Sequence, residues 1–125
     1  MANILLVEDE AMISEPFSII LRSQNYDVDV AYNGLEALEY CSKKSYNLIL
    51  LDIMMPYCNG VEFLEKASLK TKSPKTKVVM MTNLSSGGKE IAEAVRLGAQ
   101  RGVLKANMTP KALIELVKTE LAAKD

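Results

Sequence analysis

The chain has 125 residues, 49% of them hydrophobic and 25% charged, and its formal net charge at pH 7 is -1. This size and composition are typical of one globular domain, so we expect a single domain over residues 1–125. The small net charge argues against nucleic acid or an anionic membrane as a partner. No apolar run is long enough for a membrane span or a signal-peptide core, so the cytoplasm is the expected compartment.

The absence of histidine excludes two large classes of site. Neither a Ser-His or Cys-His nucleophilic site nor a histidine-ligated zinc site can be built. A bound metal would need oxygen ligands, which points to Mg²⁺, Ca²⁺ or Mn²⁺. Cys41 and Cys58 do not form a CxxC pair. We therefore expect two free thiols, Cys41 on a buried helix face and Cys58 in a loop.

The first predicted strand is the apolar run Ile4 to Val7, which three consecutive acids follow at positions 8–10. Apolar residues then recur at helical spacing over residues 13–21. Pro16 interrupts that pattern, so the helix should start near this residue or bend there. Residues 27–32 alternate polar and apolar side chains, which predicts a strand nearer the edge of a sheet.

A turn at Asn33-Gly34 leads into a predicted helix over residues 35–44, with Leu35 and Leu38 buried and Cys41 on the same face. The next apolar run, Leu48 to Leu51, is too short for a helix and too apolar for a strand with one wet face. It predicts a central strand of a parallel sheet.

Asp52 ends this central strand. A carboxylate there costs solvation energy unless it is paired, coordinated or at the mouth of a cleft. The alternative for one aspartate considered alone is a helix cap or a loop residue. Pro56 and the turn at Asn59-Gly60 then take the chain sharply away from the end of the strand.

The second half of the chain repeats the pattern. We predict a helix over residues 60–71, a buried strand over residues 78–81 that ends in Thr82, a flexible loop over residues 83–88 and a helix over residues 89–97. A last strand, residues 102–104, ends in Lys105, and a final helix begins at Thr109-Pro110. The side chains predicted to face the core are Val61, Leu64 and Ala67, then Ile91, Ala94 and Val95, then Leu113, Leu116, Val117 and Leu121.

The strand-helix unit thus occurs five times. Alternation of this kind predicts an α/β fold, with a parallel sheet covered by helices on both faces and right-handed crossovers. Ligands of such folds bind beyond the carboxyl ends of the strands. The residues predicted to lie there are Glu8 and Asp9, Asp52, Thr82 and Lys105.

These five residues provide three carboxylates, one hydroxyl and one ammonium. Three carboxylates in one cleft repel one another unless a cation lies among them, and Mg²⁺ accepts a shell of few carboxylates, water and ligand oxygens. Lys105 indicates that more negative charge arrives, as on a phosphoryl group, and Thr82 can donate a hydrogen bond to it. Asp52 is then the candidate nucleophile, which would form an aspartyl phosphate.

With these residues in place, the whole chain resembles a response regulator receiver domain, the phosphorylated module of two-component signalling. Glu8 and Asp9 resemble the acidic pair of that family, and Asp52 in Leu-Leu-Asp-Ile-Met-Met-Pro resembles its phosphoacceptor, with Pro56 and Gly60 at the family's spacing. Thr82 resembles its switch hydroxyl and Lys105 its lysine.

The resemblance implies a flavodoxin-like sheet of order 2-1-3-4-5 with five helices. It also implies that the main-chain carbonyl of Met54 completes the Mg²⁺ shell. The donor would be a phosphohistidine on a histidine kinase or a phosphotransfer protein. The chain would be a signalling phosphoacceptor, which assists its own phosphorylation and dephosphorylation, and not an enzyme.

Two positions depart from the family pattern. Receivers usually carry Tyr or Phe three residues before the lysine, where this chain has Gly102, so coupling from Thr82 to the output face should use something else or be weaker. The lysine is usually followed by proline, often with a cis bond, where this chain has Ala106. Because a cis bond before a non-proline residue costs about 3 kcal/mol, we predict a trans bond and a reshaped loop over residues 106–108.

Two rival functions remain open from the sequence. A pseudo-receiver would act as an interaction module without phosphate, and the missing aromatic residue and proline favour it. An aspartate-based phosphatase usually has a second Asp two residues after the nucleophile, where this chain has Met54, and a cap domain. The output is expected to pass to an unidentified protein, for which Leu84 is a candidate contact, and the chain to be a monomer or a phosphorylation-dependent dimer.

Overall fold

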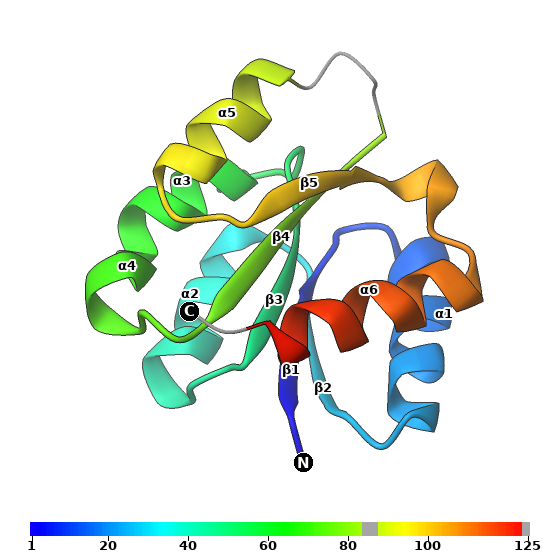
Figure 1. Cartoon of the computed structure of the whole chain (residues 1–125). Helices are drawn as coiled ribbons and strands as arrows, with labels where there is room; N and C mark the ends of the chain where they lie inside the picture. Colours follow the sequence, from blue (N-terminus) through cyan, green and yellow to red (C-terminus); the bar gives the residue numbers. More distant parts are fainter. Residues whose placement is uncertain (84–87, 124–125) are drawn as a thin grey trace.

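A computed structural model describes residues 1–83 and 88–123. Five parallel strands form one sheet in the order β2-β1-β3-β4-β5, and helices cover both of its faces (Figure 1). The predicted fold class and strand order are therefore confirmed. The strands are β1 (Asn3–Val7), β2 (Asp27–Ala31), β3 (Leu48–Asp52), β4 (Lys77–Thr82) and β5 (Arg101–Leu104).

The described residues form six α-helices, where five were predicted. They are α1 (Ala11–Ser23), α2 (Gly34–Lys43), α3 (Gly60–Ala67), α4 (Leu69–Lys72), α5 (Gly88–Arg96) and α6 (Pro110–Ala122), with a 3₁₀ turn, η1 (Lys105–Asn107). The extra helix arises because Ser68 is left-handed, with φ of 51°, and so separates α3 from α4. The single helix predicted over residues 60–71 is wrong in this respect. None of the described helices is both long and apolar enough to cross a membrane.

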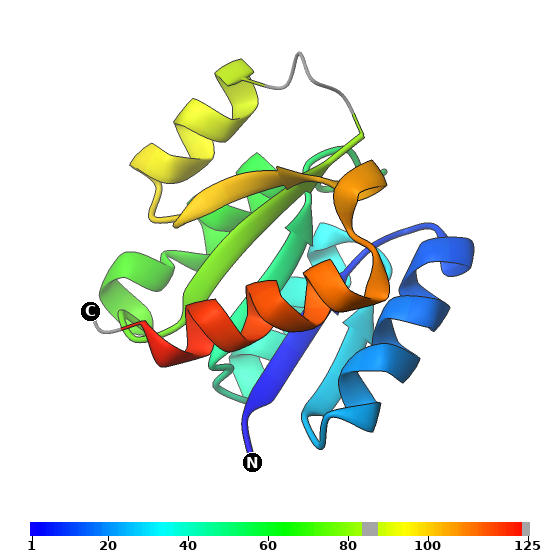
Figure 2. The ribbon, with the colours of Figure 1, turned by 45° about the vertical axis from the view of Figure 1, so that its right-hand side comes forward.

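The sheet separates two hydrophobic cores. Helices α1 and α6 lie on one face, and α2, α3 and α5 lie on the other (Figure 2). Side chains of β1 and β3 alternate between the two cores, so both strands are buried on both faces. This explains why their apolar runs are unbroken, because a polar side chain on either face would lie in a core. Because all five strands are parallel, their carboxyl ends lie at the same edge of the sheet.

The helix faces differ from the predicted ones in several places. Pro16 lies inside α1, which begins five residues earlier at Ala11, so a helix start at Pro16 is wrong. Leu35 is 50% exposed although it was predicted to be buried, and Ala37 lies in the core instead. On α5, Val95 is 44% exposed and Ala94 alone is buried. On α3, Phe63 is buried where Val61 was predicted, because the bulkier ring takes the core position.

The loop predicted over residues 83–88 is described only at its ends. Asn83 follows β4, and Gly88 is already the first residue of α5. Residues 84–87 lie outside the described residues, so the flexible loop and a partner contact at Leu84 stay predictions.

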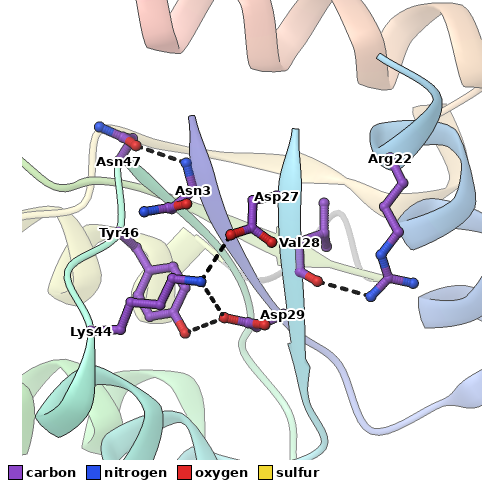
Figure 3. Close-up of polar contacts among 8 residues, drawn as sticks. All are labelled: Asn3, Arg22, Asp27, Val28, Asp29, Lys44, Tyr46 and Asn47. Atoms are coloured by element: carbon purple, nitrogen blue, oxygen red, sulfur yellow. Dashed lines mark hydrogen bonds and ion pairs between the residues drawn. The ribbon is translucent and has the colours of Figure 1, made fainter. Parts of the chain in front are cut away.

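A polar cluster ties β2 to the segment between α2 and β3, near the amino-terminal ends of the strands (Figure 3). The Lys44 Nζ lies 3.1 Å from the Oδ2 atoms of both Asp27 and Asp29. The hydroxyl of the buried Tyr46 donates to Asp29 Oδ2 at 2.7 Å. Burial alone would raise the pKa of Asp29, but the hydrogen bonds from Tyr46 and Lys44 outweigh it and hold this pKa below its usual value. The cluster therefore stabilises the fold mainly when Asp29 is ionised.

We expect Tyr46→Phe to lower the free energy of unfolding by about 1–2 kcal/mol at pH 7, because it removes one hydrogen bond to a carboxylate. Urea unfolding measures the loss. A depressed carboxyl pKa contributes stability above its unfolded value and loses it in acid, so the difference between variant and wild type should shrink as the pH falls through the folded pKa of Asp29. Tyr40→Phe, on the exposed face of α2, is the matched control and should be nearly neutral. An equal loss in both variants would contradict this account of the cluster.

Candidate functional site

Four adjacent strands deliver the predicted polar residues to one edge of the sheet. Asp52 is the last residue of β3 and Thr82 the last of β4, while Glu8 follows β1 directly and Lys105 follows β5 directly. The register pairs Asp52 with Met81 and Thr82 with Leu104, which places Thr82 beside the residue before Lys105. The carboxyl edge of the sheet therefore holds these four residues, as the sequence predicts.

The centre of the site is an ammonium shared by two carboxylates. The Lys105 Nζ lies 2.6 Å from Glu8 Oε1 and 3.0 Å from Asp52 Oδ2. All three side chains are buried, with 5%, 0% and 4% of their surface exposed. Lys105 thus reaches from the edge strand β5 across β4 to the ends of β3 and β1. A single ammonium therefore faces two carboxyl groups, and all three groups are shielded from water.

Burial dominates the electrostatics of this trio. It raises the pKa of Glu8 to about 7, the charge of Asp52 adds to the rise, and the hydrogen bond from Lys105 only partly offsets it. Burial also raises the pKa of Asp52, although Lys105 opposes the rise. For Lys105 burial alone would lower the pKa, but the hydrogen bonds to Glu8 and Asp52 outweigh it and raise the pKa. The site therefore has more carboxylate than its own lysine can keep ionised.

The acids after β1 provide ligands suited to a hard cation. Carboxylate oxygens of Glu8, Asp9 and Glu10 lie within 4.8 Å of one another, and Asp9 and Glu10 are exposed. The main-chain N–H of Glu10 also donates to Glu8 Oε2 at 3.2 Å, which orients that carboxylate. Glu10 was not in the predicted metal set, although the run of three acids in the sequence could have indicated it. All donors here are oxygens, so the residues present fit Mg²⁺.

Met54, whose carbonyl was predicted as a metal ligand, follows Asp52 by two residues. Its main-chain N–H donates to Asp52 Oδ1 at 3.3 Å, and its side chain is exposed. The loop from residue 53 to residue 60 therefore begins with a contact to the candidate nucleophile itself. The backbone of Met54 therefore lies at the site. Binding of a metal by its carbonyl stays a prediction.

Ile91 of α5 occupies the space next to Gly102, a contact that the sequence did not predict. Any Cβ at position 102 would overlap the Cδ1 atom of Ile91, and it would lie 2.9 Å from Cγ1 of the same side chain. Ile91 comes from α5, so this helix packs directly on the backbone of β5. The contact joins two consecutive elements, and no periodic pattern in the sequence indicates it.

The trans peptide bond predicted between Lys105 and Ala106 is confirmed. All peptide bonds of the described residues are trans, including the bond from Lys105 to Ala106. The chain continues as the 3₁₀ turn η1, followed by Thr109, whose side chain caps α6 by accepting from Ala112 N–H. The loop over residues 106–108 thus begins within one 3₁₀ turn, and its reshaping relative to other receivers stays a prediction.

Comparison with known proteins identifies related chains. A family model described as the response regulator receiver domain matches residues 4–118. The probable transcriptional regulator ycf29 of Porphyra purpurea is 34% identical over 116 residues, which make up 93% of this chain and 54% of that protein. Hybrid signal transduction histidine kinase B of Dictyostelium discoideum is 35% identical over 129 residues, covering 95% of this chain and 7% of that protein. The chain therefore spans about half, or far less, of the length of these relatives.

Solved structures show the same arrangement. A CheY-like response regulator receiver domain protein of Methanospirillum hungatei matches with a TM-score of 0.86 at 31% identity, covering 97% of this chain and 94% of that one. The response regulator TrrA of Thermotoga maritima, solved in complex with Mg²⁺ and BeF, matches with a TM-score of 0.81 at 31% identity, covering 96% and 99%. Both similarities extend over nearly the whole chain.

The raised pKa of Glu8 predicts how stability depends on pH. Between the usual value of 4.5 and the folded value of about 7, the folded protein keeps a proton that the unfolded chain has lost. The free energy of unfolding should therefore fall as the pH rises through this window, by up to about 3 kcal/mol, and the raised pKa of Asp52 acts in the same direction. Urea unfolding in metal-free buffer measures it.

The control for this pH dependence is Glu8→Gln, which removes the titrating group and keeps the shape of the side chain. Its free energy of unfolding should fall less steeply across the same window. Parallel curves for the two proteins would show that Glu8 ionises in the folded state as it does in the unfolded chain.

Proposed function

Because this chain belongs to the response regulator receiver domain family, we propose that it is the phosphoacceptor of a two-component phosphorelay in the cytoplasm. Transfer of a phosphoryl group to Asp52 switches a protein-interaction face. The observation that carries the proposal is the buried ammonium of Lys105 held between Glu8 and Asp52. Members of this family are signalling phosphoacceptors rather than enzymes in the usual sense, and here the chain assists its own phosphorylation and dephosphorylation.

The ligands of Mg²⁺ in this proposal are the carboxylates of Glu8, Asp9 and Asp52 and the carbonyl of Met54. When bound, Mg²⁺ neutralises negative charge on the transferring phosphoryl group. The Mg²⁺–BeF complex of the Thermotoga maritima relative supports this assignment by similarity. The chain's own contribution is a set of carboxyl groups, two buried and one exposed, that outnumber the single ammonium of Lys105.

In the transfer step, a carboxylate oxygen of Asp52 attacks the phosphorus of a phosphohistidine on a histidine kinase or phosphotransfer protein. A P–O bond forms and the P–N bond breaks, and the imidazole leaves with the bonding electron pair and takes up a proton. Lys105 pairs with the transferred oxygens, and the Thr82 hydroxyl donates a hydrogen bond to them. Later attack by water on the phosphorus releases phosphate and restores the Asp52 carboxylate.

Output in this proposal passes through α5. The Thr82 end of β4 leads toward α5, whose Ile91 lies over Gly102 of β5. A change in the backbone after Thr82 would therefore move Ile91 together with its helix and alter the face formed by α5, β5 and α6, to which a downstream protein partner binds. Ile91 thus takes the place that an aromatic side chain at position 102 has in most of the family. Whether the chain stays monomeric or dimerises on phosphorylation would be decided at this face.

The alternative is a pseudo-receiver, an interaction module that works without phosphate. The missing aromatic residue at position 102 and the missing proline at position 106 favour it. The presence of Asp52, Lys105 and the acids after β1 argues against it. The two functions differ in one measurable property, which is whether the interaction face changes when Asp52 is modified.

Incubation with Mg²⁺ and acetyl phosphate should add one phosphoryl group to the wild type, measured as intact mass. Asp52→Asn should gain none, and chelation of Mg²⁺ should abolish the gain. Lys105→Met should slow the reaction by at least tenfold while leaving the acceptor in place. A wild type that gains no mass while it binds Mg²⁺ would favour the pseudo-receiver.

Beryllofluoride with Mg²⁺, a phosphoryl mimic, should shift backbone amide resonances in two regions: the site, and α5 from residue 88 to residue 94. Ile91→Ala should reduce the α5 shifts and leave those of Asp9 and Met54 intact, because it removes the side chain that links α5 to β5. Val95→Ala, on the exposed face of the same helix, is the matched control. If α5 resonances of the wild type do not move, output through this helix is wrong.

A further inference from the structure

The loop between β3 and α3 is fixed at several points. At its start, the Ile53 N–H donates to the Met81 carbonyl of β4 at 3.1 Å. At its end, the Gly60 N–H donates back to the Ile53 carbonyl at 3.0 Å, which closes the loop on itself. In the middle, the Cys58 carbonyl accepts from Gly34 N–H of α2 at 3.0 Å. The loop that carries Met54 is thus attached to the sheet and to a helix.

The attachment at Gly34 is a close packing contact. A Cβ atom at this position would overlap the Cys58 carbonyl oxygen, and it would lie 2.7 Å from Cys58 Sγ and 2.8 Å from Cys58 Cβ. Both residues are buried, with Cys58 fully so. The backbone at Gly34 does not have positive φ, unlike that at Gly98. Glycine is therefore required here by the neighbouring loop and not by its own conformation.

The loop has little freedom to absorb a displacement. Tyr57 is left-handed, with φ of 67°, and the Cys58 N–H donates to the Pro56 carbonyl at 2.7 Å, so the chain turns within three residues. The Tyr57 side chain is 83% exposed and does not fix this conformation by packing. The turn is therefore held by two sets of hydrogen bonds. Gly34 N–H binds the Cys58 carbonyl, and Ile53 is bonded to Met81 and Gly60.

We propose that Gly34 is a positioning residue for the metal site, acting through Cys58 on the loop that carries Met54. The inference rests on the proposed function, in which the carbonyl of Met54 binds Mg²⁺. A Cβ at residue 34 would push the Cys58 carbonyl away by roughly 1 Å before an ordinary contact is reached. The hydrogen bonds at Ile53 and Gly60 fix both ends of the loop. The residues between them, which include Met54, must therefore take up the displacement. Mg²⁺ requires nearly ideal octahedral geometry, so it tolerates such a displacement poorly.

The test is the affinity of three variants for Mg²⁺ alone, followed by amide shifts of Asp9 and Met54 during titration. Gly34→Ala should weaken Mg²⁺ binding by about tenfold or more, as outer-shell changes at metal sites do. Gly88→Ala makes the same chemical change where a Cβ would meet nothing within 4 Å, and it should bind Mg²⁺ like the wild type.

The third variant, Cys58→Ala, separates loss of stability from loss of positioning. It removes the buried thiol and lowers stability, but it keeps the backbone carbonyl that Gly34 contacts, so its Mg²⁺ affinity should stay within about twofold of the wild type. A second readout is phosphorylation by acetyl phosphate. Gly34→Ala should be slow at low Mg²⁺ and regain the wild-type rate at saturating Mg²⁺. Because Mg²⁺ would also refold a partly unfolded variant, far-UV circular dichroism without Mg²⁺ must match the wild type.

The outcomes distinguish this inference from the proposed function. If the wild type binds no Mg²⁺, the metal assignment fails and the role of Gly34 fails with it. If the wild type binds Mg²⁺ and Gly34→Ala binds equally well, or Cys58→Ala loses as much affinity, only the role of Gly34 is overturned. Should Gly34→Ala fail to fold, all variants are compared in trimethylamine N-oxide, an osmolyte that favours the folded state.

Discussion

The rest of the site depends on the burial of one ammonium between two carboxylates. Removing Glu8, Asp52 and Lys105 from water costs several kcal/mol for each charge, and their mutual attraction repays this only in good geometry. Apolar side chains of similar volume at these positions would often make the domain equally or more stable, so stability alone does not explain the trio. The trio has two carboxyl groups for one ammonium, beside the further acids at positions 9 and 10. This surplus of carboxyl groups supports the proposal that the site receives a cation and a phosphoryl group.

The sheet supplies the rigidity that this arrangement needs. β1 and β3 lie at its centre with both faces covered, so Glu8 and Asp52 are held by the best-packed part of the fold. Lys105 comes from the edge strand β5, and α5, which packs on that strand, buries only Ala94 completely. Glu8 and the proposed nucleophile Asp52 therefore lie on the rigid side, and the residues that would respond to phosphate lie on the more weakly packed side. Such a division is expected of a switch, because elements that move have few buried contacts.

The sequence predicted what depends on local pattern and on strand order. Unbroken apolar runs identified β1, β3 and β4, and the parallel order then placed Glu8, Asp52 and Lys105 at one edge without any knowledge of contacts. What it missed depends on side-chain packing between different elements. The hydroxyl of Tyr46 on Asp29, Ile91 over Gly102, and Gly34 against Cys58 all join different elements. Leu35 was misassigned because its apolar character predicts burial, while Ala37, Leu38 and Cys41 form the face of α2 that packs on the core.

Two of these missed contacts share one physical feature, which is a glycine whose missing side chain leaves room for another element. At position 34 the space admits the loop that carries Met54, and at position 102 it admits Ile91 of α5. In the proposed function, the first contact would serve metal binding and the second the output. A substitution at either glycine would leave all five polar side chains of the site in the sequence and still alter what they do. Function in this chain therefore rests on how closely the backbones approach one another around the site, as well as on the side chains that carry charge.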